Sequence, residues 1–446
     1  MTADTINAAD IRINARWLIP IEPANIVLEH HAVLVQGDRI AAILPQKDAD
    51  SSYRAKEVID LPCHVVLPGL INTHGHAAMS LFRGMADDLP LMTWLNDHIW
   101  PAEGEFISEA FIGDGTQLAM AEMLRTGTTT FSDMYFFPEV VAQLAHDVGM
   151  RAQICFPLLD FPTPWGSGPD EYLSKGRAFI EQWQGNAFVS PAIGPHAPYT
   201  VSDQPLTRAI ALSEETGAAI QMHLHETGFE VADALEKTGV RPTARMAGLG
   251  LLGPNTQCVH MTQIDESDLA LLQQTGAHVI HCPESNLKLA SGLCPVHKLQ
   301  EAGVNVAIGT DGAASNNDLD LFGELSTAAM LAKAVADDAS ALSAHRALAM
   351  ATIAGARAIG RDSELGSLVP GKLADLIAVD LSDPFLQPVY DPASHLVYSR
   401  HGRQVSHSWI GGVPQVQNGE LTRIDVPDLM LRVQSWSDRI REQQSR

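Results

Sequence analysis

Two histidines separated by one residue, in the segment Thr73-His74-Gly75-His76, have the spacing of a metal-binding pair. The apolar run 65–72 stands directly before them and is predicted to be a strand. Alternate residues of a strand lie on the same face, so both imidazoles could reach one cation. Zinc is the first candidate, because imidazole nitrogens are among its preferred ligands.

Further metal-ligating residues stand at the ends of three other apolar runs. The segments are His223-Leu224-His225-Glu226, Val259-His260-Met261 and Ile308-Gly309-Thr310-Asp311-Gly312. A third histidine and an aspartate would complete a nitrogen and oxygen ligand set that leaves one coordination position for water. Such a set is typical of catalytic zinc, whereas structural zinc sites are mostly closed by thiolates.

Composition excludes several classes of protein. The net charge of -24 argues against a nucleic-acid partner or an anionic membrane surface, because phosphates would be repelled. The N-terminus has no export signal, and no apolar run reaches the about 18 residues of a membrane span, so we expect a cytoplasmic protein. The cysteines are scattered without a C-x-x-C pair, which argues against disulfides and thiolate zinc; they are Cys63, Cys155, Cys258, Cys282 and Cys294.

The elements that position the candidate ligands form a repeating pattern. Eight short apolar runs alternate with segments of helical period; the runs are 65–72, 128–133, 151–156, 188–194, 218–225, 256–261, 277–282 and 304–311. Eight βα units predict a closed parallel (β/α)8 TIM barrel of the α/β class. The candidate ligands all follow the C-terminal ends of these runs, where such barrels assemble their active sites.

Both chain ends carry alternating segments outside the barrel. Residues 11–20, 31–37 and 39–44 near one end, and 374–380, 404–410 and 413–417 near the other, alternate like half-buried strands. We expect these segments to meet in one small β-sandwich. The predicted domains are the first part of that sandwich (1–57), the barrel (58–370), and the second part with a terminal helix (371–446).

Motifs along nearly the whole chain resemble the amidohydrolase superfamily of metal-dependent hydrolases and deaminases. They lie in the segments 68–76, 281–286, 310–317 and 371–376. Within the superfamily, the chain looks most like the 5'-methylthioadenosine/S-adenosylhomocysteine deaminases. The resemblance implies hydrolytic deamination of an adenine nucleoside to the inosyl product, with release of ammonia. It also implies a homo-oligomer, either a dimer or a tetramer.

The resemblance implies one divalent metal ion in each subunit. Zn²⁺ is the first choice, with Fe²⁺ or Mn²⁺ as alternatives. The ligands would be His74, His76, His223 and Asp311. Binuclear relatives bridge two ions with a carboxylated lysine at the end of strand 4, whereas residues 190–196 here contain no lysine. We therefore expect a single ion.

Three residues are expected to carry the chemistry. Asp311 would take a proton from the attacking water, and Glu226 would protonate N1 of the purine. A carboxyl group that donates in this way must hold its proton near neutral pH. His260 would orient the nucleophile and stabilise the tetrahedral centre. Gln257 is the alternative to His260, because relatives often carry a histidine a few residues earlier.

Substrate contacts are also carried over from the family motifs. Glu103 matches the ribose-binding glutamate, Trp94 a wall of the pocket, and His196 a substrate-binding histidine. Arg151 could match an arginine near the ribose, and Glu226 would contact the base. The competing interpretation of these positions is ordinary helix surface, core or turn.

Other functions remain open at this stage. The family's second arginine has no counterpart in residues 160–170, which leaves the preferred nucleoside open. A hydrolase of s-triazines or other chloro-heterocycles, or a guanine-type base deaminase, would use the same scaffold without a ribose carboxylate. A metal-binding protein without catalysis would not need a glutamate beside the ligands or an open coordination position.

Overall fold

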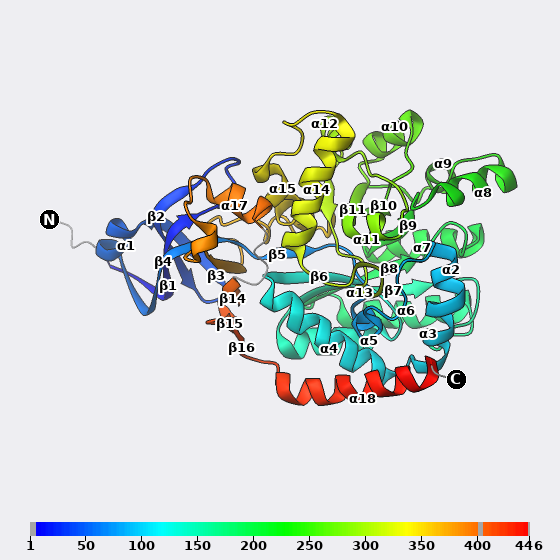
Figure 1. The fold of residues 1–446 in the computed structure, drawn as a ribbon, viewed down its shortest axis with the longest axis horizontal. Coiled ribbons are helices and arrows are strands. Elements are labelled where there is room, and N and C mark those ends of the chain that lie inside the picture. Colours follow the sequence, from blue (N-terminus) through cyan, green and yellow to red (C-terminus); the bar gives the residue numbers. More distant parts are fainter. Residues whose placement is uncertain (1–5, 400–404, 445–446) are drawn as a thin grey trace.

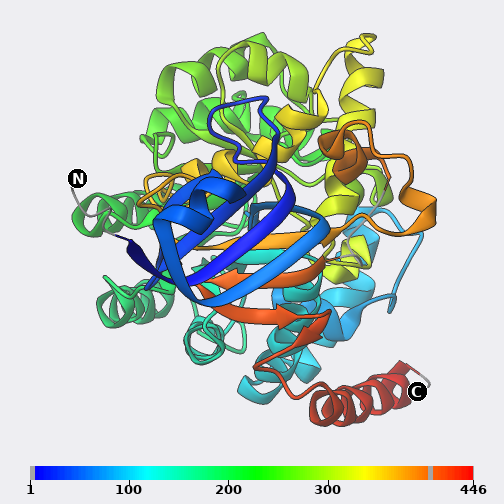
Figure 2. The same cartoon turned by 90° about the vertical axis from the view of Figure 1, so that its left-hand side faces the viewer.

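The computed structural model describes residues 6–399 and 405–444. Two eight-stranded sheets organise them. One sheet forms a barrel surrounded by helices, and the other joins segments from both ends of the chain at one side of it (Figure 1). Figure 2 shows this second sheet in front of the barrel, with N-terminal and C-terminal strands side by side. The predicted fold class, a (β/α)8 barrel with a small β domain from both ends, is confirmed.

The barrel strands are parallel and follow one another in chain order. They are β5 (Leu70–Asn72), β6 (Thr128–Met134), β7 (Arg151–Leu158), β8 (Val189–Pro195), β9 (Ala219–Leu224), β10 (Thr256–His260), β11 (His278–His281) and β12 (Val306–Ile308). The ring closes between β12 and β5, where the Thr73 amide donates to the Ile308 carbonyl at 3.1 Å. The carboxyl ends of all eight strands therefore meet around one mouth.

Helices of the outer ring follow the strands. They are α4 (Glu109–Arg125), α5 (Pro138–Val148), α6 (Pro169–Trp183), α7 (Asp203–Thr216), α8 (Gly228–Thr238), α9 (Pro242–Leu249), α10 (Glu266–Thr275), α12 (Val296–Glu301), α14 (Leu321–Ala336), α15 (Ala344–Met350) and α16 (Ile353–Ala358). Left-handed Gly217 and Gly276 end α7 and α10.

Short helices surround the barrel mouth. They are η1 (Ala77–Phe82), α2 (Leu91–Thr93), the π-helical η2 (Trp94–Ile99), α3 (Trp100–Phe106), α11 (Pro283–Lys288) and α13 (Ala313–Asn316). The last helix, α18 (Val426–Gln444), lies along α4 (Figure 1). Leu429, Trp436 and Ile440 of α18 are buried, and the Trp436 indole donates to Asp114 at 2.8 Å. Within residues 6–399 and 405–444, no helix has the length and apolar character needed to cross a bilayer.

The small sheet has the strand order β16-β15-β14-β13-β4-β1-β2-β3. Its strands are β1 (Asn7–Leu18), β2 (Leu28–Gln36), β3 (Arg39–Pro45), β4 (Tyr53–Pro68), β13 (Leu376–Asp380), β14 (Val405–Ile410), β15 (Val413–Gln417) and β16 (Glu420–Leu421), with α1 (Gln46–Ser52), η3 (Pro384–Leu386) and α17 (Pro392–Tyr398) between them. Ile13 and Val33 share one core cluster with Leu376 and Trp409. The N-terminal and C-terminal strands therefore bury a common apolar core.

The first predicted barrel strand, 65–72, is two strands in the structure. β4 pairs with β1 and β13 in the small sheet as far as Pro68, and β5 starts in the barrel at Leu70. Gly69 joins them where a Cβ would lie 2.1 Å from the Thr129 hydroxyl oxygen, so the chain can pass only without a side chain. The predicted domain boundary at 57/58 thus falls inside β4. Gln404, predicted to start a strand, lies outside the described residues, as do 1–5 and 445–446.

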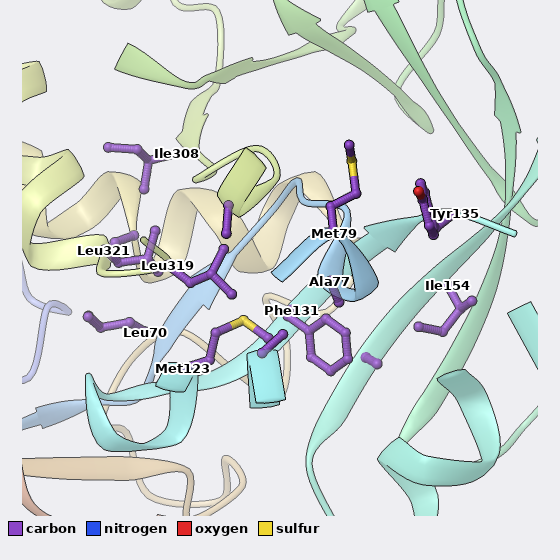
Figure 3. Packing of buried hydrophobic residues seen from close by; sticks show 14 of the residues in the cluster. Leu70, Ala77, Met79, Met123, Phe131, Tyr135, Ile154, Ile308, Leu319 and Leu321 are labelled. Carbon is purple, nitrogen blue, oxygen red and sulfur yellow. The ribbon is translucent and has the colours of Figure 1, made fainter. Parts of the chain in front are cut away.

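The main core fills the space between the barrel and its helices. Figure 3 shows part of it, where Phe131 of β6 lies beside Met123 of α4, and Ile154 of the neighbouring strand β7 lies on the other side of Phe131. Met79 and Tyr135 belong to the same cluster and also line the cavity at the mouth. The core therefore extends to the floor of the candidate site and fixes its geometry.

Candidate active site

Four histidines and an aspartate converge at the barrel mouth, from the ends of four strands or from the residues after them. One ligand atom from each of His74, His223 and His260 lies within 4.8 Å of the others, and the same holds for His74, His76 and Asp311. Asp311 Oδ1 lies 3.5 Å from His74 Nε2 and 3.2 Å from His76 Nε2. The four predicted metal ligands thus form one cluster around His74, and His260 adjoins it.

The orientation of each imidazole is fixed by a hydrogen bond at its other nitrogen. The Nδ1 atoms of His74, His76, His223 and His260 lie 2.7 or 2.8 Å from Gln221 Oε1, Met134 O, His196 O and Asn286 Oδ1, respectively. These acceptors place the ring proton on Nδ1 and leave the Nε2 lone pair directed into the cluster. His74 Nε2 is buried and has no hydrogen-bond partner among the described residues.

This donor set fits a divalent metal ion. Burial lowers the pKa of His74 and drives that of His223 well below its usual value, which keeps both rings neutral, as ligands must be. Burial would raise the pKa of Asp311, but the adjacent His74 and His76 side chains, whose Nε2 atoms lie 3.5 and 3.2 Å from its Oδ1, hold it well below its usual range. Neutral imidazole nitrogens and one carboxylate are the ligand types of catalytic zinc. A cation would also satisfy the buried His74 Nε2.

The backbone around the cluster is held in unusual conformations. His260 has φ 77° and Asp311 φ 62°, both in the left-handed region that residues with a side chain rarely adopt. Each such residue costs of order 1–3 kcal/mol, so packing must maintain it. At Gly309 an added Cβ would lie 2.8 Å from the His74 amide nitrogen. Close backbone approach and strain are therefore concentrated where the ligands meet.

Glu226 lies beside the cluster without joining it. Its Oε2 is 4.0 Å from His260 Nε2, and the residue is only 8% exposed. Burial, together with the nearby Asp311 charge, raises the pKa of Glu226 to about 8. The carboxyl group therefore holds its proton at neutral pH, as a general acid must.

A second glutamate fixes the backbone of the first. The Glu230 carboxylate accepts the amides of His225 and Glu226, both at 2.9 Å. The hydroxyl of Thr262 donates to the Glu226 carbonyl at 2.7 Å. His225 itself turns away, because its Nε2 contacts Thr243 and its Nδ1 the Gln263 carbonyl. The two hydrogen bonds to Glu230 and the one from Thr262 thus fix the backbone from which the Glu226 side chain extends.

A cavity of about 240 Å³ opens over the cluster. Its lining contains four members of the cluster, His76, His223, His260 and Asp311. It also contains four predicted substrate-binding residues, Trp94, Glu103, His196 and Glu226. The Tyr135 hydroxyl donates to Glu103 Oε1 at 2.6 Å, and burial raises the pKa of Glu103 to about 7. Burial lowers the pKa of His196 to about 4, so that ring is neutral. The mouth of the barrel therefore combines acid-base groups with a hollow for a small molecule.

The structure does not bring Arg151 to this cavity. Arg151 begins β7, so it lies at the amino end of the strand, opposite the mouth. Its guanidinium group pairs with both oxygens of Asp375 at 2.6 and 3.0 Å and donates to the Ala187 carbonyl at 2.9 Å. The prediction of Arg151 as a substrate-binding residue is therefore wrong. The first residue of a barrel strand lies at the end of the barrel opposite the mouth, so its side chain does not reach the active-site cavity.

Several supporting residues were not assigned from the sequence. Gln221 and Asn286 orient ligand-cluster histidines from β9 and α11. The Ser285 hydroxyl donates to Asp311 Oδ2 at 2.7 Å. Only Glu230 had a local signal: Thr227 caps α8 and Glu230 follows three residues later, the spacing of a capping box. The other contacts join residues that are far apart in the chain.

Comparison with known proteins agrees with this geometry. Residues 65–414 match the Amidohydrolase family. The chain is 54% identical over 98% of both chains to a 5-methylthioadenosine/S-adenosylhomocysteine deaminase of Saccharophagus degradans. It is 46% identical to an adenosine deaminase from Xanthomonas campestris solved with bound zinc, with a TM-score of 0.97 over 98% of this chain and 100% of that one. Atrazine chlorohydrolase TrzN from Arthrobacter aurescens shares the fold, at 21% identity and a TM-score of 0.89 over 96% and 100%.

Proposed function

The chain belongs to the amidohydrolase family, and we propose on that premise that it is a hydrolytic deaminase of adenine nucleosides. Its proposed substrates are 5'-methylthioadenosine and/or S-adenosylhomocysteine, by analogy with the relative at 54% identity. The observation that carries the proposal is the buried Glu226 carboxyl group beside a histidine and aspartate cluster. A proton donor next to a metal-ligand set is what ring protonation and water attack require together.

We propose that His74, His76, His223 and Asp311 hold one divalent ion, most simply Zn²⁺. The zinc-bound relative and the unpartnered His74 Nε2 support this assignment. A bound divalent ion supplies Lewis acidity, which makes water available as a nucleophile near neutral pH. The remaining chemistry belongs to side chains of this protein.

Glu226 and Asp311 divide the proton transfers between them. As water adds to C6 of the purine, Asp311 takes a proton from it, because the low pKa of this carboxylate keeps it ionised and ready to accept. Glu226 gives its proton to N1, which receives the electron pair displaced from the ring. The C6–N bond then breaks as Asp311 returns its proton to the amino group, which leaves as ammonia. The C6 hydroxyl loses its proton to Glu226 as the C6=O bond forms, and the inosyl product remains. His260 borders the same space, and its Nε2 can accept a hydrogen bond from the attacking water and so orient it.

Glu103 is proposed to bind the two ribose hydroxyls, with Trp94 and His196 at the sides of the nucleoside. All three line the cavity, and the bond from Tyr135 fixes one Glu103 oxygen. A carboxylate can accept both hydroxyl protons of a ribose. A homo-oligomer, either a dimer or a tetramer, is also proposed on the family resemblance, and light scattering tests it.

The test is ammonia release from a panel of compounds. 5'-Methylthioadenosine, S-adenosylhomocysteine, adenosine, guanine and a chlorotriazine are each incubated with the metal-loaded protein and with protein stripped by a chelator. We expect nucleoside turnover that disappears on stripping and returns with Zn²⁺. Turnover of the triazine or guanine alone, or full turnover after stripping, contradicts the proposal. Glu103→Ala should raise KM for nucleosides, and an unchanged KM would remove its ribose role.

A further inference from the structure

The two nucleosides named for the relatives differ only in the group at the 5' position. 5'-Methylthioadenosine ends in a neutral methyl group, whereas S-adenosylhomocysteine ends in an amino acid with a carboxylate and an ammonium group. We infer that this cavity selects nucleosides with an uncharged 5' substituent and discriminates against S-adenosylhomocysteine. The inference rests on the proposed function and makes it more specific.

The charges of the cavity wall support this selection. Among the described residues, no lysine or arginine lines the cavity, and its carboxyl side chains are Glu103, Glu226 and Asp311. A carboxylate that leaves water here would meet carboxyl groups and apolar surface and would find no cationic side chain outside the ligand cluster. Removing an ion from water without a partner is strongly unfavourable.

The outer wall is apolar. Phe161, Pro162 and Pro164, in the loop after β7, line the cavity together with Phe136 from the loop after β6. Phe161 is 41% exposed, which places an apolar ring where the cavity meets solvent. Such a surface matches a methylthio group or a short alkyl chain, because burying their carbons is favourable.

This wall has a fixed shape. The Tyr172 hydroxyl lies 2.8 Å from the carbonyls of Phe161 and Gly166 and 2.9 Å from the Thr163 hydroxyl. The Thr163 amide also donates to the Gly166 carbonyl at 2.8 Å. The buried Tyr172 side chain thus connects both ends of the loop. These contacts hold the loop in place, so it does not carry a cationic side chain over the cavity.

The cations that line the neighbouring hollows are already paired. Lys237 and Arg245 line the hollows beside the cavity, next to Tyr199. Lys237 Nζ lies 2.9 Å from Asp233, and Arg245 binds Asp203 at 2.7 Å as well as two backbone carbonyls. The net charge of -24 adds repulsion for any anionic group that approaches. The charge of each of these side chains is therefore already balanced by a neighbouring carboxylate.

The experiment compares kcat/KM for four nucleosides that separate length from charge. 5'-Methylthioadenosine and adenosine are short and neutral, 5'-butylthioadenosine has the chain length of homocysteine without its charges, and S-adenosylhomocysteine carries both. We expect the three neutral compounds to lie within about tenfold of one another and S-adenosylhomocysteine to fall at least tenfold below butylthioadenosine. Equal turnover of the last two overturns the inference while leaving the deaminase assignment intact. Failure of all four overturns the proposed function itself.

A charge-introducing variant tests the cause. Phe161→Arg places a guanidinium group at the edge of the cavity, and Phe161→Gln is the matched control of similar length without charge. Neither change removes the Phe161 carbonyl that Tyr172 binds. We expect Phe161→Arg to raise the ratio of kcat/KM for S-adenosylhomocysteine over butylthioadenosine at least threefold relative to Phe161→Gln. A ratio that is the same in both variants contradicts an electrostatic origin.

Discussion

The two ends of the barrel both bury charged groups, but they treat them differently. At the amino end, Arg151 and Asp375 form a two-pronged ion pair, and the Gly411 amide also donates to Asp375 at 2.7 Å. At the mouth, His74 Nε2 and Asp133 Oδ2 are buried without partners among the described residues. The ion pair at the amino end is saturated with hydrogen bonds, whereas the mouth keeps groups available for a ligand.

This difference assigns separate roles to the two ends. The Arg151–Asp375 pair joins a barrel strand to the connection that enters β13 of the small sheet, so it holds the two parts of the molecule together. At the mouth, the left-handed backbone of His260 and Asp311 and the unpaired polar atoms lower the stability of the fold. Substitutions at the mouth should therefore affect turnover, and substitutions at the amino end should affect folding.

The largest effect on turnover is expected from Glu226→Gln. The amide keeps the size of the side chain but has no acidic proton to give to N1, so kcat should fall roughly 10²–10⁴-fold. The midpoint of thermal unfolding and the bound metal content should stay near those of the parent protein. Ammonia release, calorimetry and metal analysis measure the three quantities. A loss of metal or of stability equal to the loss of turnover would contradict the separation of roles.

The converse change is Arg151→Met at the amino end. It leaves Asp375 buried without its counter-charge, which should cost about 3–5 kcal/mol of unfolding free energy in a urea titration. The kcat of the protein that remains folded at 25 °C should change less than twofold. As a control, Arg151→Met combined with Asp375→Asn removes both charges, keeps an acceptor for Gly411, and should regain part of the stability. Turnover that falls in proportion to stability would place Arg151 in the site after all.

A smaller effect is expected from Glu230→Gln. The amide can accept only one of the two backbone protons from His225 and Glu226, and its NH₂ group repels the other. We expect kcat to fall about 10–100-fold with an unchanged metal content, because the acid is misplaced while the ligands are not. Glu236→Gln, on the exposed face of the same helix, is the matched control. Equal effects of the two substitutions would show that Glu230 has no positioning role.

The smallest predicted effect is a dependence on pH. With a pKa of about 8, Glu226 holds its proton below pH 8 and loses it above. Activity that needs this proton should therefore fall on the alkaline side, by up to tenfold per pH unit. A profile of kcat/KM between pH 6 and 10 measures it, and the residual activity of Glu226→Gln should lack that limb. A rate that rises through pH 8 would contradict Glu226 as the acid.

Most of the fold was predictable because its signals are local. Residues 128–133 and 256–261 show the apolar patterns of buried strands, and β6 and β10 lie there. The run 65–72 was predicted to be one barrel strand but is divided between the two sheets. An apolar run alone does not show which sheet each half joins. That decision depends on the side chain of Thr129, which leaves no space for a Cβ at position 69.

The site was predictable as far as its residues follow strand ends. His74, His76, His223 and Asp311 are recognisable by type and position, but the contact between His74 and Gln221 spans 147 residues and leaves no local pattern. Arg151 was misassigned for a related reason. The motif placed it near a strand, while its direction and its partner Asp375 depend on the folded barrel.

The sequence alone determined which side chains can bind a metal and transfer protons, and that all of them follow strand ends. This was possible because periodicity is local and parallel strands bring their carboxyl ends to one edge. Only the tertiary structure decided which of these groups are charged and what surrounds them. The raised pKa of Glu226 and the lack of lysine or arginine among the described residues of the cavity wall both follow from burial and from neighbours distant in the chain.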